Sequence, residues 1–352
     1  MKKNVIYIAI ITLVFIFVIA AVLSVKYMTE ISKELSETNI EKKADNIPDY
    51  HFMIITNELN FSSGQAFIDG VNLACEDYNA VVEINEFKRE NIDQQIKTVA
   101  IAVASKVDGI ILQATDQDLF VEQINQAVDQ GIPVITIFED AARSKRLSYI
   151  GVNSYELGTL AADLASKAVA GSGEMAIIFD GLEDKQFDTA KSLIEAGVRE
   201  GLVKSPDLTL KMIDITTTGI LGAGDITKEI ITQEHGVNVI FCTSPNTTKG
   251  VAQAIVDLNM VGKIKIIGYG DDQYILNYIE KGIIDVSLLG DNQRIGYQSI
   301  ESAMKYLEEG RISDFEDAGI YVINKDNVGD YLDKAGEEGE GNWDKLSRIF
   351  LI

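Results

Sequence analysis

The stretch DGIILQATDQDLFVEQINQAVDQGIPVITIFED, residues 108–140, contains one complete unit of the fold. A short apolar run, Gly109–Gln113, is followed by a polar turn, by a segment of helical periodicity at Leu119–Gln130 and by a second apolar run at Val134–Phe138. Short Val and Ile runs that are apolar at almost every position, separated by helices, are typical of parallel strands covered on both faces. The stretch therefore predicts a strand–helix–strand unit of a parallel sheet.

The same alternation of apolar runs and helical segments continues on both sides of this unit. The further strand candidates are His51–Thr56, Val81–Phe87, Tyr149–Val152, Glu174–Phe179, Leu208–Ile215, Val237–Phe241 and Lys263–Gly268. Because the pattern is used twice in succession, we expect an α/β fold with two doubly wound parallel-sheet lobes. Open sheets of this kind bind ligands beyond the carboxyl ends of their strands.

Polar residues gather directly after these strands. The clusters are Asn57–Phe61, Thr115–Asp118, Glu139-Asp140, Asn153-Ser154, Asp180, Thr243–Asn246 and Asp271-Asp272. Taken singly, each is more typical of a turn or a helix N-cap than of a ligand contact. Asn153, Asn246 and Asp271 stand where helices are expected to begin, so capping alone is enough to explain them. Their repeated place after strands predicts one polar rim on each lobe, and two facing rims make a cleft.

Composition limits the functions that the chain can have. Its 352 residues include 31 Lys and Arg against 54 Asp and Glu, and a formal charge of -23 argues against nucleic acid as a partner. Two cysteines and two histidines are too few for a disulfide scaffold or a His/Cys zinc site. The sequence has no GxxxxGK(S/T), HExxH or GxSxG motif. We therefore expect no cofactor, no metal and no catalytic residues, and an enzyme in the cleft is the least supported hypothesis.

The amino terminus predicts a membrane segment. After the short basic start of residues 1–4, the run VIYIAIITLVFIFVIAAVLSV, Val5–Val25, carries no charge. At about 1.5 Å per residue it is long enough to cross a hydrocarbon core of roughly 30 Å. Lys2 and Lys3 predict that residues 1–4 lie in the cytoplasm and the body outside it. The alternative is a signal peptide that is cleaved to release the protein, although the apolar part of such a peptide is usually shorter.

Two polar segments flank the expected body. Residues 26–49 form a juxtamembrane linker rich in Glu, Lys, Ser and Asn, which is either a solvated spacer or a stalk that pairs with a partner. Residues 331–352 form an acidic, glycine-rich tail with an apolar end, and this end either docks on the body or stays disordered.

Four stretches share their order and spacing with one known family. They are residues 108–140, SYIGVNSYELGTLAADL at 148–164, VIFCTSPNTTKGVAQAI at 239–255 and KIKIIGYGDDQYILNYIEKGIIDVSLLGDNQRIGYQSI at 263–300. Together they resemble the periplasmic sugar-binding proteins of type I, the ribose-binding-like group. The likeness covers roughly residues 50–330.

The resemblance implies a type I periplasmic-binding-protein fold, in which two α/β lobes are joined by three crossing strands. It assigns residues 50–152 and 291–318 to the first lobe and residues 153–290 and 319–330 to the second. The crossings are then expected near 138–153, 289–291 and 318–321. LacI-type repressors share this body but begin with a DNA-binding helix-turn-helix, and this chain has its apolar segment in that place.

The strand ends and the resemblance together give eleven candidate ligand contacts. These are Asn60, Phe61, Asp116, Phe138, Glu139, Asp140, Asn153, Ser244, Asn246, Asp271 and Asp291. The match is loose, because the aromatic positions of the family's first loop correspond to Ser63 and Gly64 and its second-lobe Arg corresponds to Ser192 or Ile194. An acidic rim without Arg is therefore expected, better suited to a cationic ligand or to a sugar met by carboxylates than to an anion.

These features predict an extracytoplasmic solute-binding protein, held in the cell membrane by a single pass. It is expected to close on a carbohydrate or a related small ligand, for delivery to an ABC permease or for signalling to a sensor histidine kinase. The alternative is a sensor-accessory or protein-interaction module whose ligand site is altered or lost, with the rim acids serving only as helix caps.

Overall fold

The structure is a computed structural model that describes residues 26, 48–59, 61–170, 172–181, 189–233 and 236–332, with the backbone alone at 61 and 62. By its contacts the chain divides into two units, Met1–Asp49 and Tyr50–Ile352, and the body described below belongs to the second. The predicted membrane segment at 5–25 and the tail from residue 333 lie outside the described residues. None of the helices that are described is long and apolar enough to span a bilayer.

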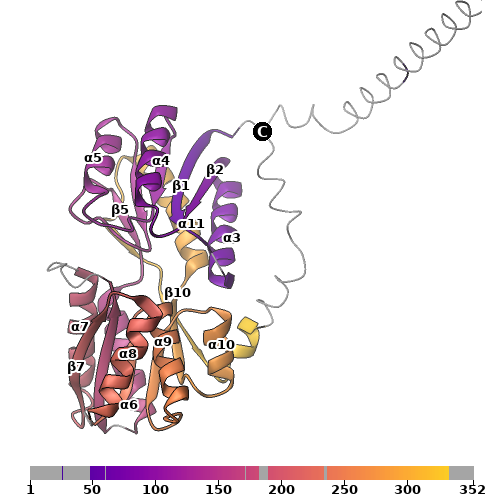
Figure 1. Cartoon of the computed structure of the whole chain (residues 1–352). Helices are drawn as coiled ribbons and strands as arrows, with labels where there is room; N and C mark the ends of the chain where they lie inside the picture. Colours follow the sequence, from indigo (N-terminus) through magenta and orange to yellow (C-terminus); the bar gives the residue numbers. More distant parts are fainter. Residues whose placement is uncertain are drawn as a thin grey trace, which may run out of the picture. The chain divides into compact units, whose positions relative to one another are not determined.

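The first lobe contains a six-stranded, wholly parallel sheet (Figure 1). In the order β11-β5-β4-β3-β1-β2, its strands are β11 (Phe315–Asp317), β5 (Ser148–Gly151), β4 (Val134–Ile137), β3 (Gly109–Leu112), β1 (Tyr50–Asn57) and β2 (Ala80–Phe87). The helices packed on it are α3 (Phe61–Tyr78), α4 (Ile92–Ser105), α5 (Val121–Asp129) and α11 (Asn292–Glu309). Every residue of β3 and β4 is buried, as expected for central strands covered on both faces.

The second lobe repeats this plan. In the order β12-β10-β9-β8-β6-β7, its strands are β12 (Ile320–Asn324), β10 (Val286–Gly290), β9 (Lys265–Tyr269), β8 (Val237–Cys242), β6 (Gly173–Asp180) and β7 (Leu208–Thr216). Its helices are α6 (Ser154–Ala168), α7 (Thr189–Leu202), α8 (Gly219–Thr232), α9 (Pro245–Asp257) and α10 (Gln273–Glu280). Only the edge strand β12 runs antiparallel to its neighbour. The prediction of two doubly wound parallel-sheet lobes is confirmed.

Each sheet is buried by helices on both faces, because neighbouring residues of a strand point to opposite sides. In β1, Phe52 and Ile54 pack with α3 and α11, whereas Met53 and Ile55 pack with α4 and α5. In the second lobe, β6 divides its side chains in the same way between α6 and α7 on one face and α8, α9 and α10 on the other. A strand that is apolar at successive positions therefore serves two cores at once.

In both lobes, glycines let paired helices approach closely. A Cβ atom on Gly296 of α11 would lie 2.1 Å from the carbonyl oxygen of Phe67 in α3. A Cβ atom on Gly158 of α6 would lie 2.1 Å from the carbonyl oxygen of Ile194 in α7. Since the opposing atoms belong to backbone that cannot swing away, only glycine permits this spacing of the helix axes.

The chain passes between the lobes three times: between β5 and α6, between β10 and α11, and between β11 and β12. The three segments are bonded to one another. The backbone N–H of Ala318 donates to the carbonyl of Gly151 at 3.0 Å, and that of Asp291 donates to the carbonyl of Gly319 at 3.3 Å. Any movement of one lobe against the other must therefore pass through this hydrogen-bonded element.

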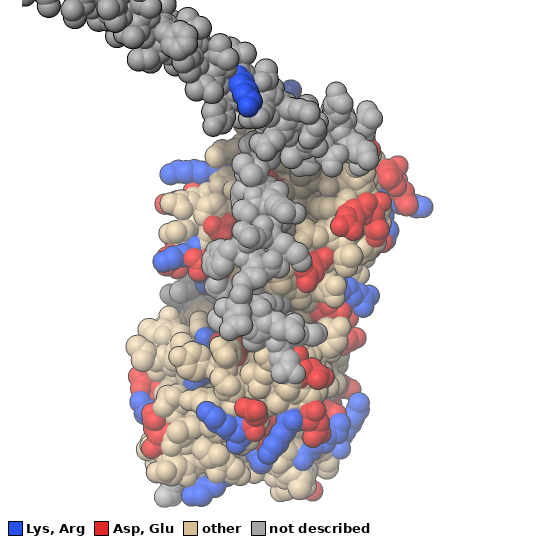
Figure 2. Space-filling model, turned by 90° about the vertical axis from the view of Figure 1, so that its right-hand side faces the viewer, with Lys and Arg blue, Asp and Glu red and all other residues tan. Residues whose placement is uncertain are grey.

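Charged side chains are interspersed on the face of the molecule that Figure 2 shows. Where described residues are visible on this face, Lys and Arg side chains lie beside Asp and Glu side chains.

Candidate ligand-binding site

The ends of β1 and β3 are joined by side-chain hydrogen bonds. Gln113 Oε1 accepts from the Thr56 hydroxyl at 2.8 Å and from the backbone N–H of Asn57 at 3.0 Å. Asn57 Oδ1 accepts from Gln95 Nε2 at 3.0 Å and from the Thr115 hydroxyl at 3.2 Å. Thr56 and Gln95 are fully buried, so these bonds replace the water contacts that burial removes. This satisfied network holds the ends of β1 and β3 rigidly in place at the rim of the first lobe.

An arginine that the sequence analysis did not predict is connected to this network through Glu139. Arg89, two residues past β2, pairs with Glu139, two residues past β4. Both guanidinium NH2 groups donate to the carboxylate, Nη2 to Oε2 at 3.1 Å, and Gln113 Nε2 donates to Oε1 at 3.1 Å. Burial lowers the pKa of Arg89, but Glu139 and then Asp180 of the second lobe outweigh it and raise that pKa above its ordinary value. The expectation of a rim without Arg was therefore wrong.

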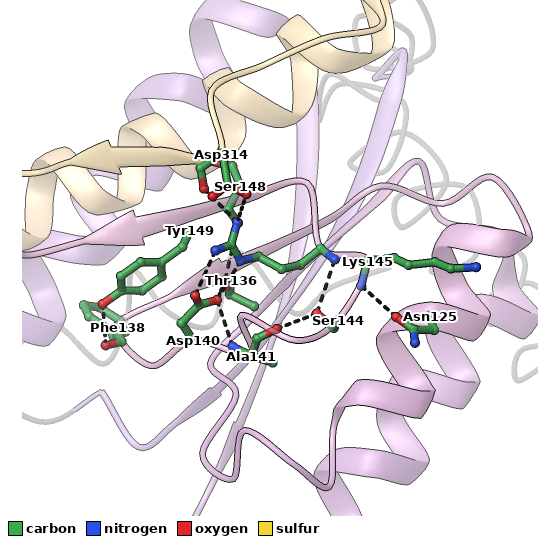
Figure 3. Close-up of polar contacts among 11 residues, drawn as sticks. Asn125, Thr136, Phe138, Asp140, Ala141, Ser144, Lys145, Ser148, Tyr149 and Asp314 are labelled. Atoms are coloured by element: carbon green, nitrogen blue, oxygen red, sulfur yellow. Dashed lines mark hydrogen bonds and ion pairs between the residues drawn. The ribbon is translucent and has the colours of Figure 1, made fainter. Parts of the chain in front are cut away.

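Asp140 is occupied within its own lobe (Figure 3). Its Oδ1 accepts from the Thr136 hydroxyl at 2.6 Å and from the N–H of Ala141 at 2.8 Å. Arg146 Nε donates to Oδ1 at 2.8 Å and Nη2 to Oδ2 at 2.9 Å, while Nη1 donates to the Asp314 carboxylate at 2.6 Å. Burial lowers the pKa of Arg146, but Asp140 and then Asp314 raise it by more. Asp140 thus fastens the loop after β4 to the residues before β11.

Phe138 directs its ring into the core of the first lobe. It stands directly after β4 with a φ of 58°, a left-handed conformation that bulky residues rarely adopt. Its ring centroid lies 5.3 Å from that of Phe67, and its carbonyl accepts from the Tyr149 hydroxyl at 3.0 Å. Burial, then Asp140 and then Tyr269 of the second lobe raise the pKa of Tyr149. The ring is therefore half-buried packing and not a free stacking face.

Three predicted polar side chains meet at the end of β6 in the second lobe. Asp180 Oδ2 accepts from Ser244 Oγ at 3.0 Å and from Asn246 Nδ2 at 3.4 Å. Ser244 is the N-cap of α9, since its Oγ accepts from the N–H of Thr247 at 3.1 Å and its own N–H donates to the Thr247 hydroxyl at 3.0 Å. Capping of this helix, which the sequence suggested for Asn246, falls to Ser244.

The carboxylates before α10 are both buried. Asp272 accepts from two backbone N–H groups of the first turn of α10, at 3.0 and 3.1 Å, and lies 2.6 Å from Lys249 Nζ. Asp272 is therefore the cap that the sequence assigned to Asp271. Asp271 is 5% exposed. The pKa of Tyr269 is raised to about 12, mainly by the burial of Tyr269 itself and then by the negative charge of Asp271.

Asn153 and Asp291 belong to the crossing segments. Asn153 caps α6 through two backbone N–H bonds to its Oδ1, which confirms the predicted cap, and its own N–H donates to Asp317 Oδ1 at 3.2 Å. Asp291 caps α11 through its Oδ1, while its Oδ2 accepts from the Tyr321 hydroxyl of β12 at 3.1 Å. Both residues therefore connect a helix of one lobe to a strand at the crossings.

Comparison with known proteins identifies the family. The family model described as the periplasmic binding protein domain matches residues 55–311, which is more than half of the chain. The chain belongs to the periplasmic binding protein family. A search of curated protein sequences finds no match.

Solved structures of this family resemble the body closely. The sugar-binding protein of a sugar ABC transporter from Bacillus halodurans is 25% identical, with a TM-score of 0.72 over 80% of this chain and 100% of that one. GanP, a glucose-galactose binding protein from Geobacillus stearothermophilus, is 25% identical, with a TM-score of 0.70 over 79% and 98%. A chain of the XylFII-LytSN complex is 25% identical, with a TM-score of 0.65 over 79% and 99%.

The remaining candidates of this periplasmic binding protein are on or beside the first lobe. Asp116 forms a turn, its Oδ1 accepting from the backbone N–H of Asp118 at 3.0 Å and of Leu119 at 3.2 Å. Asn60 lies outside the described residues, and of Phe61 only the backbone at the start of α3 is described. Among the residues that are described, no group of three or more His, Cys, Asp or Glu could hold a metal ion.

The structure thus brings Glu139 and Asp140 together after β4, and Ser244 and Asn246 together before α9. Sequence reasoning missed Arg89 as a rim residue and left Asp180 out of the candidate contacts. The available signal was position, because Arg89 follows the end of β2 by two residues and Asp180 is the last residue of β6.

Proposed function

We propose that this protein captures a small carbohydrate or a related ligand between its two lobes. The observation that carries the proposal is the pair of polar rims at the carboxyl ends of two sheets with the same strand order, linked by one hydrogen-bonded crossing element. Relatives described as sugar-binding and glucose-galactose binding proteins support carbohydrate as the class of ligand. Of the candidate contacts, we propose Glu139, Asn246 and Asp271 as direct ones.

Binding is the whole chemistry in this proposal, and the protein is not an enzyme. A ligand that touches both rims makes its full set of contacts only when the lobes are closed. It therefore shifts the population from open toward closed by its differential affinity for the two forms. A partner that recognises the closed form then reads the presence of the ligand.

A ligand screen tests the proposal. The full-length chain in detergent is tested by thermal shift and calorimetry against pentoses, hexoses, polyols, nucleosides and amines. A true ligand at 100 times its Kd adds about 2.7 kcal/mol to the free energy of unfolding, which corresponds to a Tm rise of about 5 °C or more. A melting temperature that no compound of the panel moves contradicts solute capture.

We further propose that residues 5–25 anchor the protein in the cell membrane, with the body outside the cytoplasm. In this arrangement residues 26–49 are the linker, residues 50–152 with 291–318 form the first lobe, residues 153–290 with 319–330 form the second, and the tail follows. The apolar run of Val5–Val25 supports the anchor. Extraction of the protein from membranes by carbonate, or a mature chain that starts after residue 25, contradicts it.

The partner is either an ABC permease or a sensor histidine kinase. The likeness to a chain of the XylFII-LytSN complex favours a sensor-accessory module as the second candidate function. The two functions differ in what binding requires. A stable complex with a sensor ectodomain in the absence of any sugar supports the accessory module, whereas a complex that needs the ligand supports solute capture with signalling.

A further inference from the structure

We propose that Tyr149 is a positioning residue for ligand capture, because its hydroxyl group holds the backbone turn that carries Glu139 to the rim of the first lobe. This inference rests on the proposed function, in which Glu139 is a direct contact, and it adds a residue that acts on the ligand only through Glu139. The turn consists of Ile137, which is the last residue of β4, followed by Phe138 and Glu139.

The backbone of this turn is strained. The N–H of Glu139 donates to the carbonyl of Ile137 at 2.6 Å, and Phe138 between them has a φ of 58°. A hydrogen bond between residues two positions apart, around a central residue of positive φ, defines the rarer and more strained form of the γ-turn. Because bulky residues disfavour positive φ, such a turn persists only where its surroundings hold it.

Three contacts within the first lobe hold Phe138 in this conformation. Its N–H donates to the carbonyl of Ile150 in β5 at 3.3 Å, and its ring centroid lies 5.3 Å from that of Phe67 in α3. Its carbonyl accepts from the Tyr149 hydroxyl at 3.0 Å (Figure 3). Of these contacts, the bond from Tyr149 is the one that the removal of a single oxygen atom abolishes.

The surroundings of the Tyr149 hydroxyl fit this role. A Cβ atom on Gly151 would lie 2.3 Å from the hydroxyl oxygen, so glycine at this position leaves the space that the hydroxyl fills. The carbonyl of Gly151 accepts from the N–H of Ala318, which fixes this end of β5 to another crossing segment. The ring of Tyr149 lies 5.7 Å from that of Phe315. Burial and then the charge of Asp140 raise the pKa of Tyr149, so its hydroxyl stays protonated and can donate.

The turn determines where the Glu139 carboxylate lies. The carbonyl of Glu139 accepts from the N–H of Ala114 at 3.1 Å, so the backbone of Glu139 is bonded on both sides. Its carboxylate accepts from Arg89 and Gln113. A turn that relaxed to an ordinary negative φ would move this backbone, and the carboxylate would then have to be ordered again when a ligand binds. Such ordering lowers affinity, whereas a preformed contact avoids it.

Hydrogen exchange on the full-length chain in detergent tests the turn without a ligand. Peptides that contain the amides of Phe138 and Glu139 are compared by mass spectrometry in wild type, Tyr149→Phe and Tyr297→Phe. Tyr297→Phe is the matched control, because it removes a tyrosine hydroxyl that donates to Asp77 at 2.9 Å elsewhere in the first lobe. We expect these amides to exchange about tenfold faster in Tyr149→Phe and at the wild-type rate in Tyr297→Phe. Unchanged exchange in Tyr149→Phe overturns the inference.

A double-mutant cycle measures the effect on binding. Calorimetry with D-ribose, L-arabinose, D-xylose, D-glucose and D-galactose is run on wild type, Tyr149→Phe, Glu139→Ala and the double variant. For a sugar that wild type binds, we expect Tyr149→Phe to weaken binding by about fivefold to tenfold, but by less than about twofold in the Glu139→Ala background. A loss of affinity that is equal in both backgrounds, or no loss in Tyr149→Phe, overturns this inference alone. A wild-type chain that binds none of the sugars overturns the proposed function, and the inference with it.

Discussion

The two lobes share one strand order but hold their rim carboxylates differently. In the first lobe Glu139 and Asp140 are each gripped by a guanidinium, from Arg89 and Arg146. In the second lobe Asp180 is held by a hydroxyl and an amide. The same fold therefore holds Glu139 and Asp140 of the first lobe with guanidinium groups, and Asp180 of the second lobe with neutral donors.

The difference shows that a doubly wound frame fixes where polar groups stand but not how their charges are balanced. Strand order places a carboxylate after β4 and another at the end of β6. Whether each is neutralised depends on side chains that arrive from elsewhere in the chain, such as Arg89, which is fifty positions away from Glu139. The first lobe holds its rim acid Asp140 with the buried Arg146, whose side chain is 7% exposed, whereas the corresponding cation of the second lobe, Lys249, is 23% exposed.

Substitution of Arg146 by Met is expected to have the largest effect. The Arg146 side chain is 7% exposed and Asp140 is 20% exposed, so the variant leaves a largely buried carboxylate without its cation. Breaking a buried pair in this way costs about 3–5 kcal/mol of unfolding free energy, and the bond to the 86% exposed Asp314 adds little.

Chemical denaturation with urea measures the loss. Arg143→Gln is the control, because its pair with Asp118 is exposed and is expected to contribute less than about 1 kcal/mol. Equal stabilities for the Arg146 and Arg143 variants would show that the first lobe does not rely on its buried cation.

Glycine-to-alanine substitutions test what the lobes have in common. Gly296→Ala in the first lobe and Gly158→Ala in the second each place a Cβ atom 2.1 Å from a backbone carbonyl oxygen, so the helix pair must separate. We expect both to lower the free energy of unfolding by about 1–3 kcal/mol, as overpacking does. Gly329→Ala is the control, since nothing lies within 4 Å of its added Cβ atom. A tolerated Gly158→Ala beside a damaging Gly296→Ala shows that the lobes differ in packing as well.

The strands and the first caps could be predicted from the sequence, because they depend on neighbouring residues. The apolar run at Val134–Phe138 predicts β4, which the structure ends at Ile137. Asn153 caps α6 as expected. The cap of α9 is Ser244, two residues before the predicted Asn246, and the cap of α10 is Asp272, one residue after the predicted Asp271. Cap assignment depends on which residue takes an extended backbone, and a run of polar residues does not decide this.

The candidate site could be predicted only in part, because its pairings are non-local. The position of Glu139 beside the rim follows from β4, but its partner Arg89 comes from the edge strand β2. Asp140 has the same local context as Glu139 and yet turns to the buried Arg146. Arg146 is only six residues from Asp140, but this spacing alone does not tell which of the two neighbouring acids it pairs with.

Substitution of Lys249 by Met tests how much the ion pair with Asp272 stabilises the second lobe, as Arg146→Met does for the ion pair with Asp140 in the first. Lys249 pairs with the buried Asp272 but is itself 23% exposed, and Asp272 keeps its two backbone N–H donors. We therefore expect a loss of about 1–2 kcal/mol by urea denaturation, less than for Arg146→Met. Lys228→Met, which removes an exposed pair with Asp225, serves as the control. A loss as large as that of Arg146→Met contradicts the contrast between the lobes.

Alkaline pH is expected to produce the smallest effect, through Tyr269 beside the acidic rim. Burial and then Asp271 raise the pKa of Tyr269 from 10.0 to about 12 in the folded protein. The folded state therefore favours the neutral phenol, and the stability present below pH 10 is lost as the pH rises toward 12. Between pH 9 and pH 11 we expect wild type to lose about 1 kcal/mol more than Tyr269→Phe. Tyr274→Phe, at a residue that is 70% exposed, is the control, and equal losses in wild type and Tyr269→Phe contradict the assignment.

The most direct test of the account is the distance between the two lobes with and without ligand. Spin labels are placed at Ala142→Cys in the first lobe and Thr217→Cys in the second, because both positions are exposed. The partly exposed Cys75 is replaced by Ala so that it is not labelled, and Cys242 is kept because it is fully buried. The distance between the labels is measured on the full-length chain by pulsed electron paramagnetic resonance, without ligand and with a saturating concentration of a sugar that binds by calorimetry. We predict a shorter distance with the sugar. An unchanged distribution of distances at saturation contradicts capture by lobe closure.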